Sequence, residues 1–214
     1  MIAFSRVKIP PFMLLLAVTV GLALTACGPL KAGSAATVGD ESLPEASVAT
    51  ASAEIDAVLA AADAAAALPP EQVNQRVVGL WVDGQITEAL AAAEGVDVTQ
   101  GEVDRFLEQF DEQARVDITV QAAIPPTQLD SAARTALLRN ALAVQLAPDG
   151  TPEEQSQVLN EALAATAADL GVSVNPRFGA WNPAVPGVEA RAADRLSTPV
   201  KSEEPVDPLV PGTP

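Results

Sequence analysis

Apolar residues recur every three or four positions along most of the chain between residues 44 and 170, which is the repeat of amphipathic helices. Prolines, glycines and capping residues separate the periodic stretches. We therefore predict five helices, over about 44–68, 70–94, 100–115, 127–146 and 152–170. Two of them begin at capping boxes, in which a threonine precedes a glutamate by three residues: Thr99 with Glu102 and Thr151 with Glu154.

Short stretches with the alternation of strands flank this helical region. Residues 37–39 (Thr-Val-Gly) precede the first helix, and residues 172–174 (Val-Ser-Val) follow the last one. A lone strand of this length is unstable, so we expect the two to pair and join the ends of the domain. The predicted fold class is mainly α, with five helices in one domain and a two-stranded pairing of its ends.

The first 26 residues have the pattern of a secretory signal peptide. Arg6 and Lys8 precede an apolar run, 9–24, that is shorter than the roughly 20 residues needed to cross a bilayer. The run ends in Leu24-Thr25-Ala26-Cys27, which resembles the lipobox of bacterial lipoprotein precursors. That resemblance implies cleavage before Cys27, lipidation of its thiol and acylation, for example with palmitate. One alternative is a plain signal peptide followed by an incidental cysteine, and another is a free or disulfide-bonded thiol at Cys27.

The rest of the chain divides by composition into three parts. Residues 27–35 form a short tether, and residues 36–182 hold the helical domain. Residues 183–214 contain seven prolines and few apolar residues, so this tail cannot bury enough surface to fold, and we predict that it is disordered.

Composition excludes several classes of function. The whole chain carries a net charge of −16, which argues against nucleic acid as a partner because phosphate binding needs clustered Lys and Arg. The chain has no histidine and one cysteine, so it lacks Ser-His, Cys-His and His-ligated zinc chemistry. We expect no cofactor, no bound metal, no small-molecule substrate and no enzymatic activity.

One cluster of carboxylates is the main feature that could argue for a metal site or for enzymatic activity. Asp104, Glu108, Asp111 and Glu112 would share one face of a helix over 100–115, as a metal or acid–base site requires. The opposite face carries apolar side chains, and an amphipathic helix normally has a solvated acidic face of this kind. We interpret these four residues as a solvated face.

Three short motifs carry a resemblance to a known family. They are residues 36–43 (Ala-Thr-Val-Gly-Asp-Glu-Ser-Leu), residues 95–99 (Gly-Val-Asp-Val-Thr) and residues 172–179 (Val-Ser-Val-Asn-Pro-Arg-Phe-Gly). Here the chain resembles the N-terminal helical domain of SurA-type periplasmic chaperones, which is related to PrsA and trigger factor. It has neither the length nor the histidines of the parvulin isomerase domains that accompany that domain, so the resemblance implies chaperone activity without prolyl isomerase activity.

The resemblance implies a lipoprotein anchored to the extracytoplasmic face of the cell membrane through Cys27. It would hold unfolded or partly folded secreted and cell-envelope proteins in an apolar crevice. Candidate crevice residues are Leu80, Trp81, Phe106 and Phe110; the alternative is that all four are ordinary core residues. A second hypothesis is a scaffold that binds one defined cell-envelope partner. A holdase should expose an apolar patch larger than a few hundred Å², whereas a scaffold needs only a small one.

Overall fold

The computed structural model describes residues 31–64, 68–183 and 187–189. The predicted signal peptide, Cys27 and most of the predicted tether and tail therefore lie outside the described residues. Within the described residues the protein is mainly helical with a few short strands, which confirms the predicted fold class. None of the helices in these ranges is both long and apolar enough to cross a membrane.

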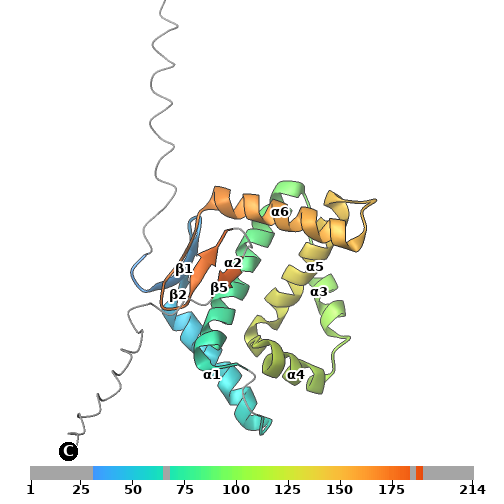
Figure 1. Cartoon of the computed structure of the whole chain (residues 1–214). Helices are drawn as coiled ribbons and strands as arrows, with labels where there is room; N and C mark the ends of the chain where they lie inside the picture. Colours follow the sequence, from blue (N-terminus) through green and yellow to red (C-terminus); the bar gives the residue numbers. More distant parts are fainter. Residues whose placement is uncertain (1–30, 65–67, 184–186, 190–214) are drawn as a thin grey trace, which may run out of the picture.

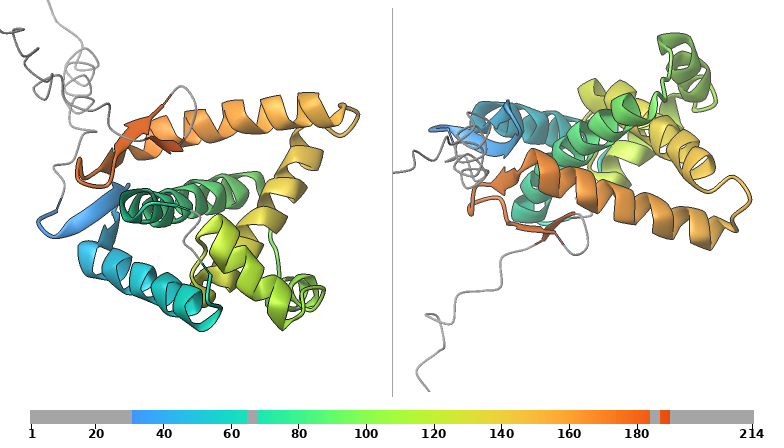
Figure 2. Two further views of the ribbon diagram at one scale, coloured as in Figure 1. Left: turned by 60° about the horizontal axis from the view of Figure 1, so that its bottom comes forward. Right: turned by 90° about the horizontal axis from the view of Figure 1, so that it is seen from above.

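Six α-helices make up most of the described chain, and α2 lies at their centre (Figures 1 and 2). It contacts α1 on one side and α6 on the other, and α5 crosses it towards its far end. A short 3-10 helix precedes α5. The elements are α1 (Glu45–Ala61), α2 (Pro70–Glu94), α3 (Gln100–Leu107), α4 (Glu112–Ala122), the 3-10 helix (Pro126–Gln128), α5 (Leu129–Leu146) and α6 (Pro152–Leu170).

The two ends of the helical region meet in an antiparallel sheet of order β2-β1-β3. Val38 pairs with Val172 and Ala36 with Val174, so the predicted pairing of the domain ends is confirmed. Sequence reasoning missed a third strand on the other side of β1 and a separate hairpin further on. The strands are β1 (Ser34–Val38), β2 (Glu41–Pro44), β3 (Val172–Val174), β4 (Ala180–Asn182) and β5 (Gly187–Glu189).

The apolar core is centred on one side of α2. Val77, Val78 and Val82 are completely buried there, and Ile86 is 2 % exposed. The side chains packed around them include Val48 and Ile55 from α1, Leu138 and Leu142 from α5, and Leu163 from α6. Burial of this apolar surface holds the six helices together.

The first helix ends seven residues earlier than predicted. The N–H of Ala64 donates to the carbonyl of Leu59 at 3.0 Å, and Asp63 has a positive φ of 48°. This is the Schellman arrangement that also ends α2, where Gly95 (φ 70°) takes the left-handed position and Val96 bonds back to Ala91. The prolines at 69 and 70 therefore begin α2 and do not end α1.

The predicted helix over 100–115 is wrong, because the chain forms two helices there. The helix α3 stops at Leu107, and the Arg115 guanidinium donates to the carbonyls of Leu107 (3.0 Å) and Phe110 (3.2 Å). The carboxylate of Asp111 accepts the N–H of Ala114 at 2.8 Å and so caps α4. A cation at one helix end and an acidic cap at the next helix start stabilise the break.

Both predicted domain boundaries need correction. Ser34 and Ala35, assigned to the tether, are buried in β1. Residues 187–189, assigned to the disordered tail, form β5, which pairs with β4. The folded part therefore extends beyond the predicted range of 36–182 at each end.

The segment between β3 and β5 closes the fold. The side-chain amide of Asn175 donates to the Glu45 carboxylate at 3.0 Å, and Arg177 forms an ion pair with the same carboxylate at 2.8 Å. Phe178 and Trp181 pack against the core. These contacts fix the end of the domain to the start of α1.

A groove along the second helix

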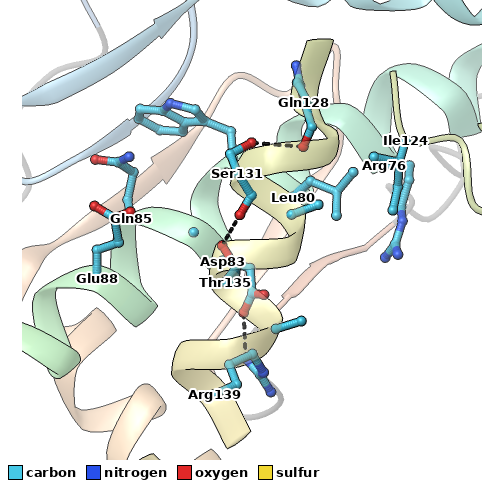
Figure 3. Close-up of a pocket in the computed structure, with 14 residues that line it drawn as sticks. Arg76, Leu80, Asp83, Gln85, Glu88, Ile124, Gln128, Ser131, Thr135 and Arg139 are labelled. Carbon is cyan, nitrogen blue, oxygen red and sulfur yellow. Dashed lines mark hydrogen bonds and ion pairs between the residues drawn. The ribbon is translucent and has the colours of Figure 1, made fainter. Parts of the chain in front are cut away.

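A hollow of about 380 Å³ lies between α2 and α5 (Figure 3). Side chains spaced by three and four residues on each helix line it, and Ile124, from the loop before α5, closes one side. The α2 residues are Arg76, Leu80, Trp81, Asp83, Gly84, Gln85 and Glu88; the α5 side contributes Gln128, Ser131, Ala132, Thr135, Ala136 and Arg139.

A second hollow, of about 530 Å³, lies between α2 and β5. It shares Arg76, Leu80 and Asp83 with the first hollow, so these three residues separate two parts of one depression. We call the two hollows together the α2 groove. The remaining residues of the second hollow are Leu68, Gln72, Gln75, Gly79, Gly187 and Val188.

Small residues keep the groove open while the helices remain in contact. A Cβ atom at Gly84 would lie 3.4 Å from Oγ1 of Thr135, so α2 and α5 approach closely there. At Gly79 a Cβ atom would lie 3.9 Å from Cβ of Val188, so β5 runs close over the same helix.

A half-buried ion pair lies in the groove. Nη1 of Arg139 is 2.7 Å from Oδ1 of Asp83 (Figure 3). Burial raises the pKa of Asp83 above its ordinary value of 3.8, because the desolvation of the carboxylate outweighs its attraction to Arg139 and Arg76. The surroundings of Asp83 in the groove therefore destabilise its ionised form relative to water.

Several hydrogen-bonding groups in the groove have no protein partner within the described residues. They are the side-chain amides of Gln72, Gln85 and Gln128 and the indole N–H of Trp81. Gln75 differs, because its amide donates to the carbonyl of Val188 at 2.7 Å and holds β5 against α2. The groove therefore combines apolar surface with neutral donors and acceptors that are free to bind a ligand.

The structure separates the four candidate crevice residues into two pairs. Leu80 and Trp81 line the α2 groove and are partly buried. Phe106 and Phe110 contact each other edge to face, with ring centroids 5.4 Å apart, at the end of α3. Neither phenylalanine lines the groove, so the structure brings only Leu80 and Trp81 together there. Trp81 and Phe106 also pack against the core.

The acidic cluster does not share one helix face. Asp104 is in α3, Glu108 ends that helix, and Asp111 caps α4. Across the described ranges, no three Asp, Glu or Cys side chains are grouped closely enough to hold a metal ion. Cys27 lies outside these ranges, so its lipidation stays a prediction.

Sequence reasoning missed the polar members of the groove. Gln85, Gln128 and Arg139 have the sequence pattern of ordinary exposed helix residues. The only available signal was spacing, since Arg76, Leu80 and Asp83 lie three and four residues apart on one stripe of a helix. Comparison with protein families, characterised proteins and solved structures gives no match for this chain.

Proposed function

We propose that the protein is a lipid-anchored polypeptide-binding protein of the extracytoplasmic membrane face, and that its α2 groove holds an extended segment of one defined partner. The observation that carries the proposal is the combination, in one groove, of Leu80 and Trp81 with unpaired amides. An extended peptide offers the matching chemistry, because it has apolar side chains together with backbone N–H and C=O groups that need partners.

The rest of the described surface favours one partner over many unfolded ones. The most exposed large apolar side chains are Val144 at 49 % and Val158 at 36 %, and neither lines the groove. A general holdase needs a wide apolar surface to capture unrelated chains. A narrow groove with fixed polar groups instead selects a segment by its hydrogen bonds and its side-chain spacing.

The anchor part of the proposal rests on Cys27 and the lipobox-like sequence before it. Because a single short acyl chain binds weakly, two or more chains are needed for a stable anchor. A Cys27→Ser variant is expected to lose both incorporation of an alkyne-labelled fatty acid and its place in the membrane fraction. Equal labelling of the wild type and the variant would contradict lipidation at this residue.

The groove is tested by selecting binders from a library of short random peptides with the mature chain purified in detergent. We expect enriched peptides to share one motif and to bind the wild type and Val144→Asp alike. They should lose binding to Leu80→Asp, because a charge in the groove opposes the burial of an apolar side chain. Val144→Asp is the matched control, since it places the same charge on an exposed part of α5.

The other outcomes are also informative. Peptides without a common motif, together with suppression of aggregation of unrelated unfolded proteins, would support a general holdase instead. Binding that is unaffected by Leu80→Asp, in a variant with unchanged thermal unfolding, would place the site elsewhere and overturn the proposal for this groove.

A further inference from the structure

Residues 205–214 have a regular pattern of prolines, and the described residues do not include this segment. Pro205, Pro208, Pro211 and Pro214 recur at every third position in the sequence PVDPLVPGTP. A polyproline II helix has three residues per turn, so prolines at this spacing would lie along one edge of such a helix. We call residues 205–214 the proline repeat.

The groove and the proline repeat match in length and in position along the chain. The α2 residues that line the groove run from Gln72 to Glu88, which is roughly 24 Å at 1.5 Å per residue. Ten residues in the polyproline II conformation span roughly 28 Å. The chain leaves β5 beside the groove, because Val188 lines it, and residues 190–204 are long enough to reach any part of it, at roughly 3.1 Å per extended residue.

The chemistry of the groove also suits such a segment. A polyproline II helix makes no internal hydrogen bonds, so its carbonyl groups need donors. Such segments bind in grooves where an aromatic side chain packs against the proline rings. The indole of Trp81 offers both the ring and an N–H, and the amides of Gln85 and Gln128 offer further donors.

Charge complementarity agrees with this assignment. Arg76 lines both hollows and uses its Nε to donate to the carbonyl of Ala122 at 3.3 Å. Within the described residues it forms no ion pair, so the rest of its guanidinium is available. Asp207 has the only charged side chain of the proline repeat. An Arg76–Asp207 pair would fix the direction of the segment in the groove.

We propose that residues 205–214 of the same chain occupy the α2 groove as a polyproline II segment and compete there with the partner. This inference rests on the proposed function, since it assigns a built-in competitor to the same groove. A partner segment then has to displace the proline repeat, which lowers its apparent affinity in the full chain compared with a chain whose proline repeat is disabled.

The experiment uses full mature chains carrying Trp181→Phe, so that Trp81 is the single tryptophan. In a variant with Pro205→Ala, Pro208→Ala and Pro211→Ala, Trp81 emission is expected to shift to longer wavelength and to be quenched more by acrylamide. A synthetic peptide of residues 203–214 should reverse both changes in this variant and leave the chain with intact prolines unaffected. Pro199→Ala is the matched control, because it removes a proline outside the repeat.

Unchanged Trp81 emission in the triple variant would overturn the inference. An emission shift that depends on protein concentration would overturn it as well, because it would mean that the repeat binds a second copy. If the triple variant is unchanged while Leu80-dependent library peptides still bind, the proposed function stands and only the built-in competitor is wrong. If the triple variant changes Trp81 emission but no library peptide binds even to that variant, whose groove is free of the repeat, the partner proposal is wrong.

Discussion

The two sides of α2 have opposite properties although they belong to the same helix. On one side Val77, Val78 and Val82 are completely buried and pack against α1, α5 and α6. On the other side Leu80, Trp81 and Asp83 are only partly buried and line the α2 groove. On the core side, the apolar side chains are buried against other parts of the protein. On the groove side, apolar surface and hydrogen-bonding groups remain accessible to a ligand.

The difference shows that a binding site in a small helical domain is stabilised less well by packing than the core is. A well-packed core excludes water and leaves few unpaired polar groups. The groove instead retains a carboxylate, Asp83, whose charged form its surroundings disfavour, and amides without protein partners. We expect substitutions on the core side to change stability, and substitutions on the groove side to change binding.

The largest expected effect tests this comparison directly. Ile86→Ala should lower the free energy of unfolding by about 2–5 kcal/mol, because it removes a fully buried side chain and leaves a cavity. Leu80→Ala should cost less than about 1 kcal/mol, since Leu80 already borders the open groove. Urea unfolding of the two variants measures both values, and equal losses would mean that Leu80 belongs to the core.

The next effect concerns the wall that β5 forms along the groove. Gly179 has φ of +129°, and a Cβ atom there would lie 2.6 Å from the carbonyl oxygen of Glu189. Gly179→Ala should therefore cost about 1–3 kcal/mol and speed amide hydrogen exchange in the β4–β5 hairpin. Gly101→Ala is the control, because nothing lies within 4 Å of its Cβ position, and it should raise stability slightly. Unchanged exchange in Gly179→Ala would contradict the crowding.

A smaller effect tests whether every polar group on the core side of α2 has a hydrogen-bond partner. The hydroxyl of Thr87 is fully buried and has no hydrogen-bond partner among the described residues. Thr87→Val should therefore raise the free energy of unfolding by about 1 kcal/mol, because it removes an unsatisfied polar group while keeping the shape.

Thr119 is the matched control for Thr87. It is equally buried, but its hydroxyl donates to the carbonyl of Arg115 at 3.3 Å. Thr119→Val should therefore lose stability in the same denaturant titration. A loss in both variants would show that the Thr87 hydroxyl is bonded in solution.

The smallest effect appears as a pH dependence on the groove side. Because burial raises the pKa of Asp83 in the folded protein, its ionisation opposes folding, and this cost develops as the pH rises above the ordinary value of 3.8. Asp83→Asn should therefore gain stability relative to the wild type as pH increases through that window, and the difference should vanish below it. Thermal unfolding at several pH values measures it, with the exposed Asp56→Asn as control. A difference that does not change with pH would contradict the raised pKa.

Elements with local signals were predictable from the sequence. In the first turn of α6, the N–H of Thr151 donates to the Glu154 carboxylate at 2.8 Å, as the predicted capping box requires. The α2 helix begins at Pro70 and ends at Glu94, directly before Gly95, as proline and glycine indicated. The pairing of β1 with β3 followed from alternation alone, although these strands are far apart in the chain.

Elements set by tertiary contacts were not predictable in this way. The apolar spacing of Val103, Phe106 and Phe110 continues across the break between α3 and α4, so periodicity hid the Asp111 cap. Leu80 and Trp81 follow the same helical spacing as the core valines, and only the packing of α5 and β5 shows that they face a groove. No local signal identifies Asp83 as the partner of Arg139, because α2 and α5 are distant in sequence.

The position of β3 and β5 sets the order in which the molecule is completed. The backbone hydrogen bonds of the helices α2 to α6 join residues four apart, whereas the pairing of β1 with β3 must wait for Val172–Val174, and the groove must wait for Val188. A chain that emerges with its amino terminus first therefore holds most of its helices before it has a complete groove. The site becomes available only after Val188 has been synthesised, and the proline repeat follows later in the sequence.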